Sequence, residues 1–174
     1  ARGVRTADGR EFTGRVVVSN ANAPDTLGKL LGQPDLVKAS LARMEKLSIS
    51  LSTFQVFLGL KKDLVGGLGI KDTEIFYNTG YDIEADYAAA VSGDFSNPGF
   101  GATLYDNLYK GYSPAGKNTL SIMTLQGYGP GEKYEADYFA GRKDAYRAEK
   151  ERLADILIKT VEEKLLPGLS KPIE

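Results

Sequence analysis

Two residue types are missing from this sequence, and their absence limits the kinds of catalysis and metal binding that it could support. Its 174 residues include neither His nor Cys, which excludes imidazole bases, thiolate nucleophiles and metal centres bound by these ligands. The carboxylates of the C-terminal third follow the charge pattern of an exposed helical face, and we find no pair of them suited to acid–base catalysis. No catalytic side chain is therefore assigned. If the chain is part of an enzyme, we expect a cofactor to supply the chemistry.

One glycine-rich stretch comes within one residue of a phosphate-binding loop. Positions 111–118 read GYSPAGKN, so that Asn118 stands where such a loop carries the Ser or Thr hydroxyl that holds magnesium. The stretch also leads into a strand pattern, whereas a phosphate-binding loop opens a helix whose N-terminal amides hold the anion. A Pro-Gly turn that enters a strand is the favoured interpretation.

A second glycine cluster, at Gly127, Gly129 and Gly131, follows a predicted strand as dinucleotide-binding turns do. The spacing does not fit, because Glu132 occupies the place of the third glycine and would repel a pyrophosphate. A turn is favoured here too.

Aromatic residues are spread over strands and loops, and tyrosines are frequent in the loops between positions 105 and 128. Most of these rings fit packing roles, since aromatic side chains carry a large apolar area wherever they lie. The tyrosine-rich loops would also suit the mouth of a pocket for a long apolar molecule with a polar end.

The elements that must position these residues centre on an uncharged stretch from Leu47 to Leu60. Its branched and aromatic residues predict a long strand near the middle of a sheet, covered on both faces. A strand that lines a cavity and a strand that is fully packed in a core both agree with its mixture of hydroxyl and apolar groups. Alternation would place on one face Ser48, Ser50, Ser52, Phe54, Val56 and Leu58, and on the other Ile49, Leu51, Thr53, Gln55, Phe57 and Gly59.

The remaining elements follow from periodicity and capping signals. A flexible connection is expected at 65–69. Strands are predicted at 4–6, 15–19, 73–78, 100–105 and 117–126, and helices at 24–31, 34–46, 82–91, 134–140 and 144–166. This irregular order favours an α+β fold, with a mixed, largely antiparallel β-sheet flanked by helices and an N-terminal hairpin.

The composition of the chain limits the classes of partner that it is expected to bind. The chain carries 22 basic and 23 acidic side chains, so it has no overall basic field of the kind that attracts nucleic acid, and no nucleic acid is expected as a partner. No apolar run is long enough to cross a bilayer, and the first residues lack a secretory signal. We expect a cytoplasmic location, with peripheral membrane contact left open for the parent and the oligomeric state undetermined.

Four stretches, in this order, resemble the phytoene desaturase-like flavoproteins. They are Gly3 to Phe12 with Arg15 to Ala21, then Phe54 to Leu60, Ser113 to Leu120 and Leu165 to Leu169. In that family the first stretch leads from the flavin domain into the substrate domain, and the second is the central strand of the substrate domain. The family includes carotenoid desaturases, carotenoid isomerases and retinol saturase-like enzymes, which use FAD on long polyenes.

The resemblance implies a piece of a longer enzyme of carotenoid biosynthesis. Residues 1–23 would be the fringe of an FAD-binding domain, and residues 24–174 would be the substrate-binding domain. Most of the FAD site would lie outside this chain, with its margin formed by Ser19, Asn20 and Ala21. Strand alternation, rather than a family motif, selects as the wall that faces the polyene Phe54, Val56, Tyr105 and Met123.

The sequence thus predicts the substrate-binding portion of an FAD-dependent, phytoene dehydrogenase-related oxidoreductase or isomerase. It would act on carotenoid- or retinoid-like apolar substrates by hydride transfer to or from the flavin, and the isolated chain would be inactive. Two alternatives remain open. One is a flavin-free binding module for a lipid or retinoid, and the other is a scaffold or dimerisation domain whose long C-terminal helix packs on a partner.

Overall fold

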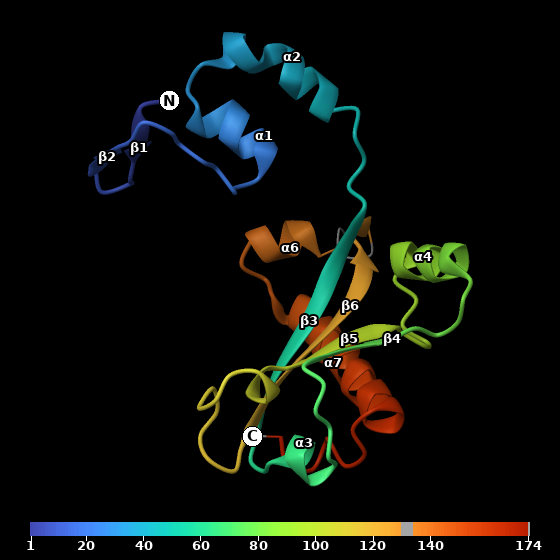
Figure 1. Cartoon of the computed structure of the whole chain (residues 1–174). Helices are drawn as coiled ribbons and strands as arrows, with labels where there is room; N and C mark the ends of the chain where they lie inside the picture. The colour runs from blue at the N-terminus through green and yellow to red at the C-terminus, as the bar shows by residue number, and fades with distance from the viewer. Residues whose placement is uncertain (130–133, 174) are drawn as a thin grey trace. The chain divides into compact units, whose positions relative to one another are not determined.

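The computed structural model describes residues 1–129 and 134–173, which form two compact units, Ala1–Ile49 and Ser50–Glu174 (Figure 1). We refer to these as unit 1 and unit 2. The functional division expected from the sequence, into residues 1–23 and 24–174, stays a prediction.

Unit 1 opens with the antiparallel strands β1 (Gly3–Arg5) and β2 (Glu11–Thr13). The turn between them contains Gly9 at a φ of 86°, where a residue with a Cβ would be strained. The hairpin is confirmed, but the prediction of its second strand at 15–19 is wrong. Gly3 already pairs with Thr13, so the residues after β2 have no partner on β1.

The two helices predicted in unit 1 are confirmed. The first comprises α1 (Ala23–Asp25), which continues into a π-helical turn, η1 (Thr26–Leu30), and the second is α2 (Pro34–Met44). Among the side chains described in this unit, Val37 alone is buried. Unit 1 therefore encloses very little apolar surface.

Unit 2 is built on a four-stranded sheet in the order β3-β6-β5-β4. The strands are β3 (Leu51–Leu60), β4 (Glu74–Tyr77), β5 (Phe100–Leu104) and β6 (Asn118–Gly127), and every strand pairing that the structure describes is antiparallel. The α+β class with a largely antiparallel sheet is confirmed, whereas the described pairings include no parallel one that would make the sheet mixed.

The long uncharged strand lies at the edge of this sheet, so its predicted central position is wrong. β3 pairs along its length with β6. Alternation holds, but only the face of Phe54, Val56 and Leu58 packs on the core, while Phe57 on the other face is 66% exposed. Apolar composition indicates that a strand has a buried face, but it does not determine the number of its neighbours.

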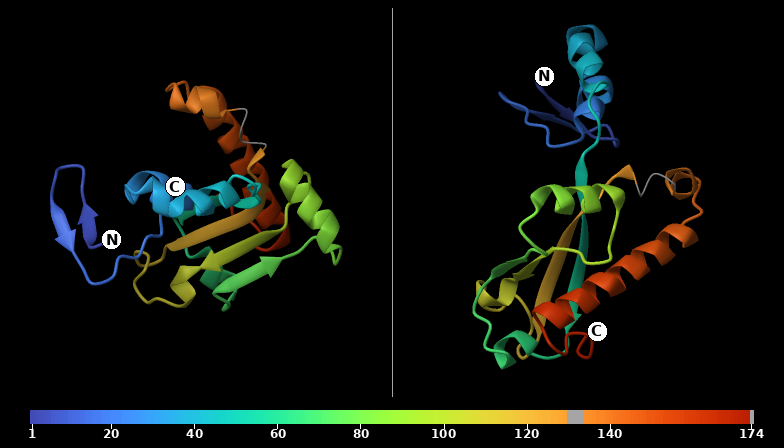
Figure 2. Two further views of the ribbon diagram at one scale, coloured as in Figure 1. Left: turned by 90° about the horizontal axis from the view of Figure 1, so that it is seen from above. Right: turned by 90° about the vertical axis from the view of Figure 1, so that its right-hand side faces the viewer.

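One face of the sheet is covered by the long helix α7 (Asp144–Lys164), which runs obliquely along it (Figure 2). Leu157 and Val161 of this helix are fully buried in the same cluster as Leu60, Leu120 and Ile122 of the sheet. We call this the inner face and the opposite one the outer face. The helix prediction at 144–166 is confirmed, as is the shorter helix before it, α6 (Glu135–Phe139).

Two short elements were not predicted. The segment expected as a flexible connection contains α3 (Leu64–Gly67), because the Asp63 carboxylate accepts a hydrogen bond from the Gly66 N–H at 2.8 Å and caps the turn. A 3₁₀ turn, η2 (Tyr105–Asn107), follows β5.

Helix α4 (Ile83–Ser92) lies beside the end of β6 (Figure 1). Asp82 caps its start by accepting the Ala85 N–H at 3.0 Å, and Gly93 ends it in the left-handed conformation. β6 continues to Gly127, past its last pairing with β5 at Met123 and Gly101. This arrangement leaves a space between α4 and the strand ends.

Candidate functional site

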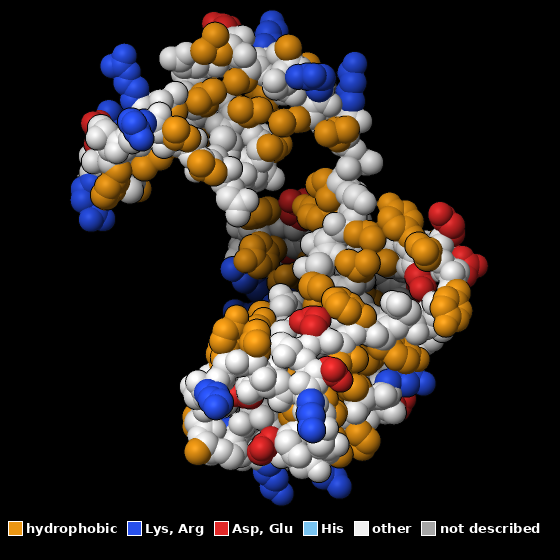
Figure 3. All heavy atoms as spheres, in the orientation of Figure 1, with side chains coloured by type: hydrophobic (Ala, Val, Ile, Leu, Met, Phe, Trp, Pro, Cys, Tyr) orange, Lys and Arg blue, Asp and Glu red, His pale blue; other side chains and the backbone are white. Residues whose placement is uncertain are grey.

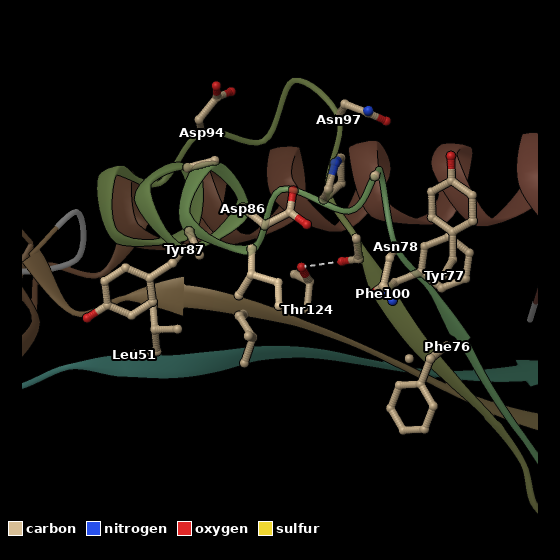
Figure 4. Close-up of a pocket in the computed structure, with 18 of the residues that line it drawn as sticks. Leu51, Phe76, Tyr77, Asn78, Asp86, Tyr87, Asp94, Asn97, Phe100 and Thr124 are labelled. Carbon is tan, nitrogen blue, oxygen red and sulfur yellow. Dashed lines mark hydrogen bonds between the residues drawn. The ribbon is translucent and has the colours of Figure 1, made fainter.

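A cavity of about 540 Å³ lies between α4 and the adjoining ends of β4, β5 and β6 (Figure 4). Its walls are largely apolar and aromatic. The rings and the thioether that line it come from α4, from the loop before α4 and from three strands of the sheet. They belong to Phe76, Tyr77, Tyr81, Tyr87, Phe100 and Met123.

Some polar groups of the cavity lining are engaged in hydrogen bonds. The Thr124 hydroxyl donates to the Gly99 carbonyl at 2.6 Å, and the Thr79 hydroxyl donates to Asp86 Oδ1 at 2.7 Å. The backbone N–H of Ser96 donates to Asp94 Oδ1 at 2.8 Å, which holds the pKa of this carboxyl below its usual value.

The side chains that line the cavity suit the binding of a ligand more than acid–base or nucleophilic catalysis. Across residues 1–129 and 134–173, the acidic side chains form no cluster that could hold a metal ion. An apolar cavity with a few polar groups can desolvate and orient an elongated apolar molecule and accept hydrogen bonds from a polar end.

The four residues predicted as a substrate wall do not come together. Phe54 and Val56 are on the inner face, where the Phe54 ring meets Phe95 edge-on at 6.1 Å. Met123 is opposite Gln55 on the outer face and lines the cavity. Tyr105 lies past the end of β5, stacked on Tyr112 at 5.0 Å between ring centroids. The contact of these residues with a substrate stays a prediction.

Sequence reasoning missed several cavity residues, and one signal could have found some of them. Met123 and Leu125 share a face of β6 by alternation, and Gly101 and Phe76 continue that face across β5 and β4. The cavity also takes Thr124 and Phe100 from the inner face, because Thr124 is opposite Phe54 and Phe100 belongs to the core cluster. Alternation along one strand could not predict a cavity that takes side chains from both faces at the strand ends.

The residues expected at the flavin margin lie in an exposed segment of unit 1 that leads into α1. The Ser19 hydroxyl is 2.8 Å from the Thr26 hydroxyl, and the Ala21 N–H donates to Ser19 Oγ at 3.4 Å. An exposed segment that bonds to itself does not enclose a ring system. The role of Ser19, Asn20 and Ala21 at the margin of a flavin stays a prediction.

The loop that resembles a phosphate-binding loop is a turn into a strand, as expected. It leads directly into β6, and the buried Asn118 uses its side-chain oxygen to accept the Val65 N–H at 3.1 Å. That oxygen is committed to packing the α3 segment against the sheet. The second glycine cluster lies in part outside the described residues, at Pro130, Gly131 and Glu132.

Comparison with curated proteins confirms the resemblance to one class, the phytoene desaturase-like family. Two relatives are the chloroplastic prolycopene isomerases of Daucus carota and Arabidopsis thaliana. The chain is 30% identical to each over 178 residues, which cover 99% of this chain and 25% and 26% of the relatives. The chain spans about a quarter of the length of these curated relatives.

No family model matches the chain, and no solved structure matches it. Within the described parts of the chain, we find no helix with the length and apolarity that a membrane crossing requires.

Proposed function

We propose that this chain is the substrate-binding part of an FAD-dependent oxidoreductase or isomerase that acts on a carotenoid-like polyene. The observation that carries the proposal is the aromatic-lined cavity at α4 in a chain that aligns over 99% of its length with prolycopene isomerases. Its volume of about 540 Å³ falls within the range of small-molecule sites. Aromatic walls suit a conjugated, apolar substrate.

The residues of this chain would bind and orient the polyene and exclude water from it. Segments outside residues 1–174 would hold most of the FAD, which exchanges hydride with its substrates when bound, and Ser19, Asn20 and Ala21 would lie at its margin. We therefore expect the chain purified by itself to be colourless and inactive. A yellow sample with stoichiometric flavin would contradict this assignment.

Substrate binding can be tested on the chain as it is. An apocarotenal titrated into the protein should quench the fluorescence of its ten Tyr residues in a saturable manner, without interference from Trp, which the chain lacks. Met123→Lys should weaken the affinity roughly tenfold or more, because this partly buried position of the cavity wall would then hold an ammonium group beside the polyene.

Leu36→Lys is the matched control, since Leu36 is an exposed residue of α2 in unit 1. Equal affinities of the two variants would overturn the assignment of the cavity. A saturated hydrocarbon of similar length should bind more weakly than the polyene. If both ligands bind equally well, the flavin-free lipid-binding module becomes the better description.

A further inference from the structure

Three segments of unit 2 meet at the end of the sheet where β6 begins. Leu60 pairs with Asn118, and the Lys61 N–H donates to the Pro172 carbonyl at 2.6 Å. The Asn107 side-chain amide donates to the Asp72 carbonyl at 2.8 Å. Residues 61–73, 105–117 and 166–173 therefore share one end of unit 2, which we call the basic end.

The basic end concentrates positive charge in a chain whose net charge is −1. Among the described residues, no acidic side chain forms an ion pair with any of its exposed lysines. Its acidic residues are Asp63, which caps α3, Asp106, which accepts hydrogen bonds from Ser113 and Thr119, and the exposed Asp72, so the lysines outnumber them. The exposed lysines are Lys61, Lys62, Lys71, Lys110 and Lys171.

Apolar side chains project between these lysines. Leu68, Leu108, Tyr109 and Tyr112 are 43%, 60%, 55% and 52% exposed. The Tyr112 ring stacks on Tyr105 and lies 6.3 Å from the Tyr109 ring, so the tyrosines form an ordered cluster. Figure 3 shows basic and hydrophobic side chains interspersed over the lower end of unit 2, with some acidic side chains among them.

We propose that the basic end docks on the surface of an anionic lipid bilayer. Leucine and tyrosine side chains can enter the interfacial region, where the apolar body of a tyrosine meets lipid and its hydroxyl stays hydrated. The lysine ammonium groups would remain at the level of the lipid phosphates and be attracted to them. The sequence left peripheral membrane contact open, and these residues supply a surface for it that does not depend on the substrate.

The residue types favour lipid over nucleic acid as the anionic partner. Every cation at this end is a lysine, and the three segments contain no Arg, the residue whose planar group best recognises phosphates and bases. The exposed Leu68 and Leu108 have no role in contacting a phosphate backbone, whereas an acyl-chain boundary accommodates them.

Vesicle sedimentation with the 174-residue chain tests the electrostatic contribution to membrane binding. We expect the chain to bind phosphatidylcholine vesicles that contain phosphatidylglycerol and to bind vesicles of phosphatidylcholine alone very little. Binding to the anionic vesicles should weaken as the salt concentration is raised. The double variant K61E/K62E should bind the anionic vesicles roughly 30-fold more weakly. K38E/K46E changes the net charge equally in unit 1 and should bind like the wild type.

Insertion of the basic end into the bilayer can be followed by the fluorescence of a single introduced tryptophan, because the natural chain contains no Trp. Tyr109→Trp should show a blue-shifted emission on anionic vesicles and quenching by brominated lipid. Phe139→Trp, at an exposed position of α6, should show neither. Equal loss of binding in the two charge variants, an unshifted Tyr109→Trp, or binding to single-stranded RNA as tight as to vesicles would each overturn the proposal.

Discussion

At the scale of single residues, Asp106 connects distant parts of a loop. Its carboxylate accepts hydrogen bonds from the Ser113 N–H at 2.9 Å, the Ser113 hydroxyl at 3.0 Å and the Thr119 N–H at 2.7 Å. These bonds tie the loop that carries Tyr109 and Tyr112 to the start of β6. The order of the exposed aromatic cluster therefore depends on one partly buried carboxylate.

Asp106→Asn should lower the free energy of unfolding by about 1–3 kcal/mol, because the amide replaces one acceptor oxygen with a donor that faces other donors. Urea unfolding followed by circular dichroism measures the change. Asp72→Asn is the control, since Asp72 is an exposed residue at the same end, and it should leave the unfolding midpoint unchanged. Equal midpoints for the two variants would argue against this role.

Gly127 sets the approach of α4 to β6. A Cβ at this position would lie 2.4 Å from the Val91 carbonyl oxygen, which is backbone and cannot rotate away. Gly127→Ala should therefore destabilise unit 2 by about 1–3 kcal/mol and shift α4, which forms one wall of the cavity. Thermal unfolding and the affinity for an apocarotenal should both change.

Gly129→Ala provides the matched comparison, because a Cβ there would meet no atom within 4 Å. If both alanine variants melt at the wild-type temperature, the contact between Gly127 and Val91 does not hold α4 in place.

At the scale of elements, α7 packs apolar side chains into the core on the inner face of the sheet. Leu157 on this helix is fully buried within the core. Leu157→Ala should cost about 2–5 kcal/mol through lost apolar contact and the cavity that remains. Lys159→Ala, at an exposed position of the same helix, should change the stability little. Denaturant unfolding distinguishes the two, and comparable losses would contradict the packing described for α7.

Local signals account for the elements that the sequence predicted correctly. Asp82 and Gly93 bracket α4, and alternation marks β6, because caps and periodicity are encoded by neighbouring residues. The order of the strands is decided by partners far apart in the chain. The sequence thus could not place β3 at the edge, nor predict that α7 covers the face of Phe54 and leaves the face of Met123 uncovered.

The kind of site was predictable from the sequence, and of the predicted wall residues Met123 lines the cavity. The sequence predicted an apolar pocket with tyrosines at its mouth, and the cavity is lined by Tyr77, Tyr81 and Tyr87. The tyrosines favoured from the sequence lie instead in the loop after β5, of which Tyr105 and Tyr112 stack on each other. A tyrosine has the same amphipathic character in both places, so composition alone does not separate them.

At the scale of the whole molecule, the two units differ in how much they bury. Unit 2 has a continuous core, whereas Val37 is the one buried hydrophobic residue described in unit 1. Residues 50–174 expressed alone should therefore unfold cooperatively at nearly the temperature of the full chain. Residues 1–49 alone should show no cooperative transition. Scanning calorimetry tests both, and loss of the transition in residues 50–174 would show that unit 2 needs unit 1 to fold.

The edge position of β3 also has a practical consequence. Apart from a single bridge between Leu60 and Ile173, the described residues provide no partner for its outer edge. Leu51–Leu60 contains no charged residue and no proline, the features by which natural edge strands discourage pairing with other molecules. Preparations of this chain by itself should lose material to sheet-extended aggregates as concentration rises. A lysine at the exposed Thr53 is the change that would best keep them in solution.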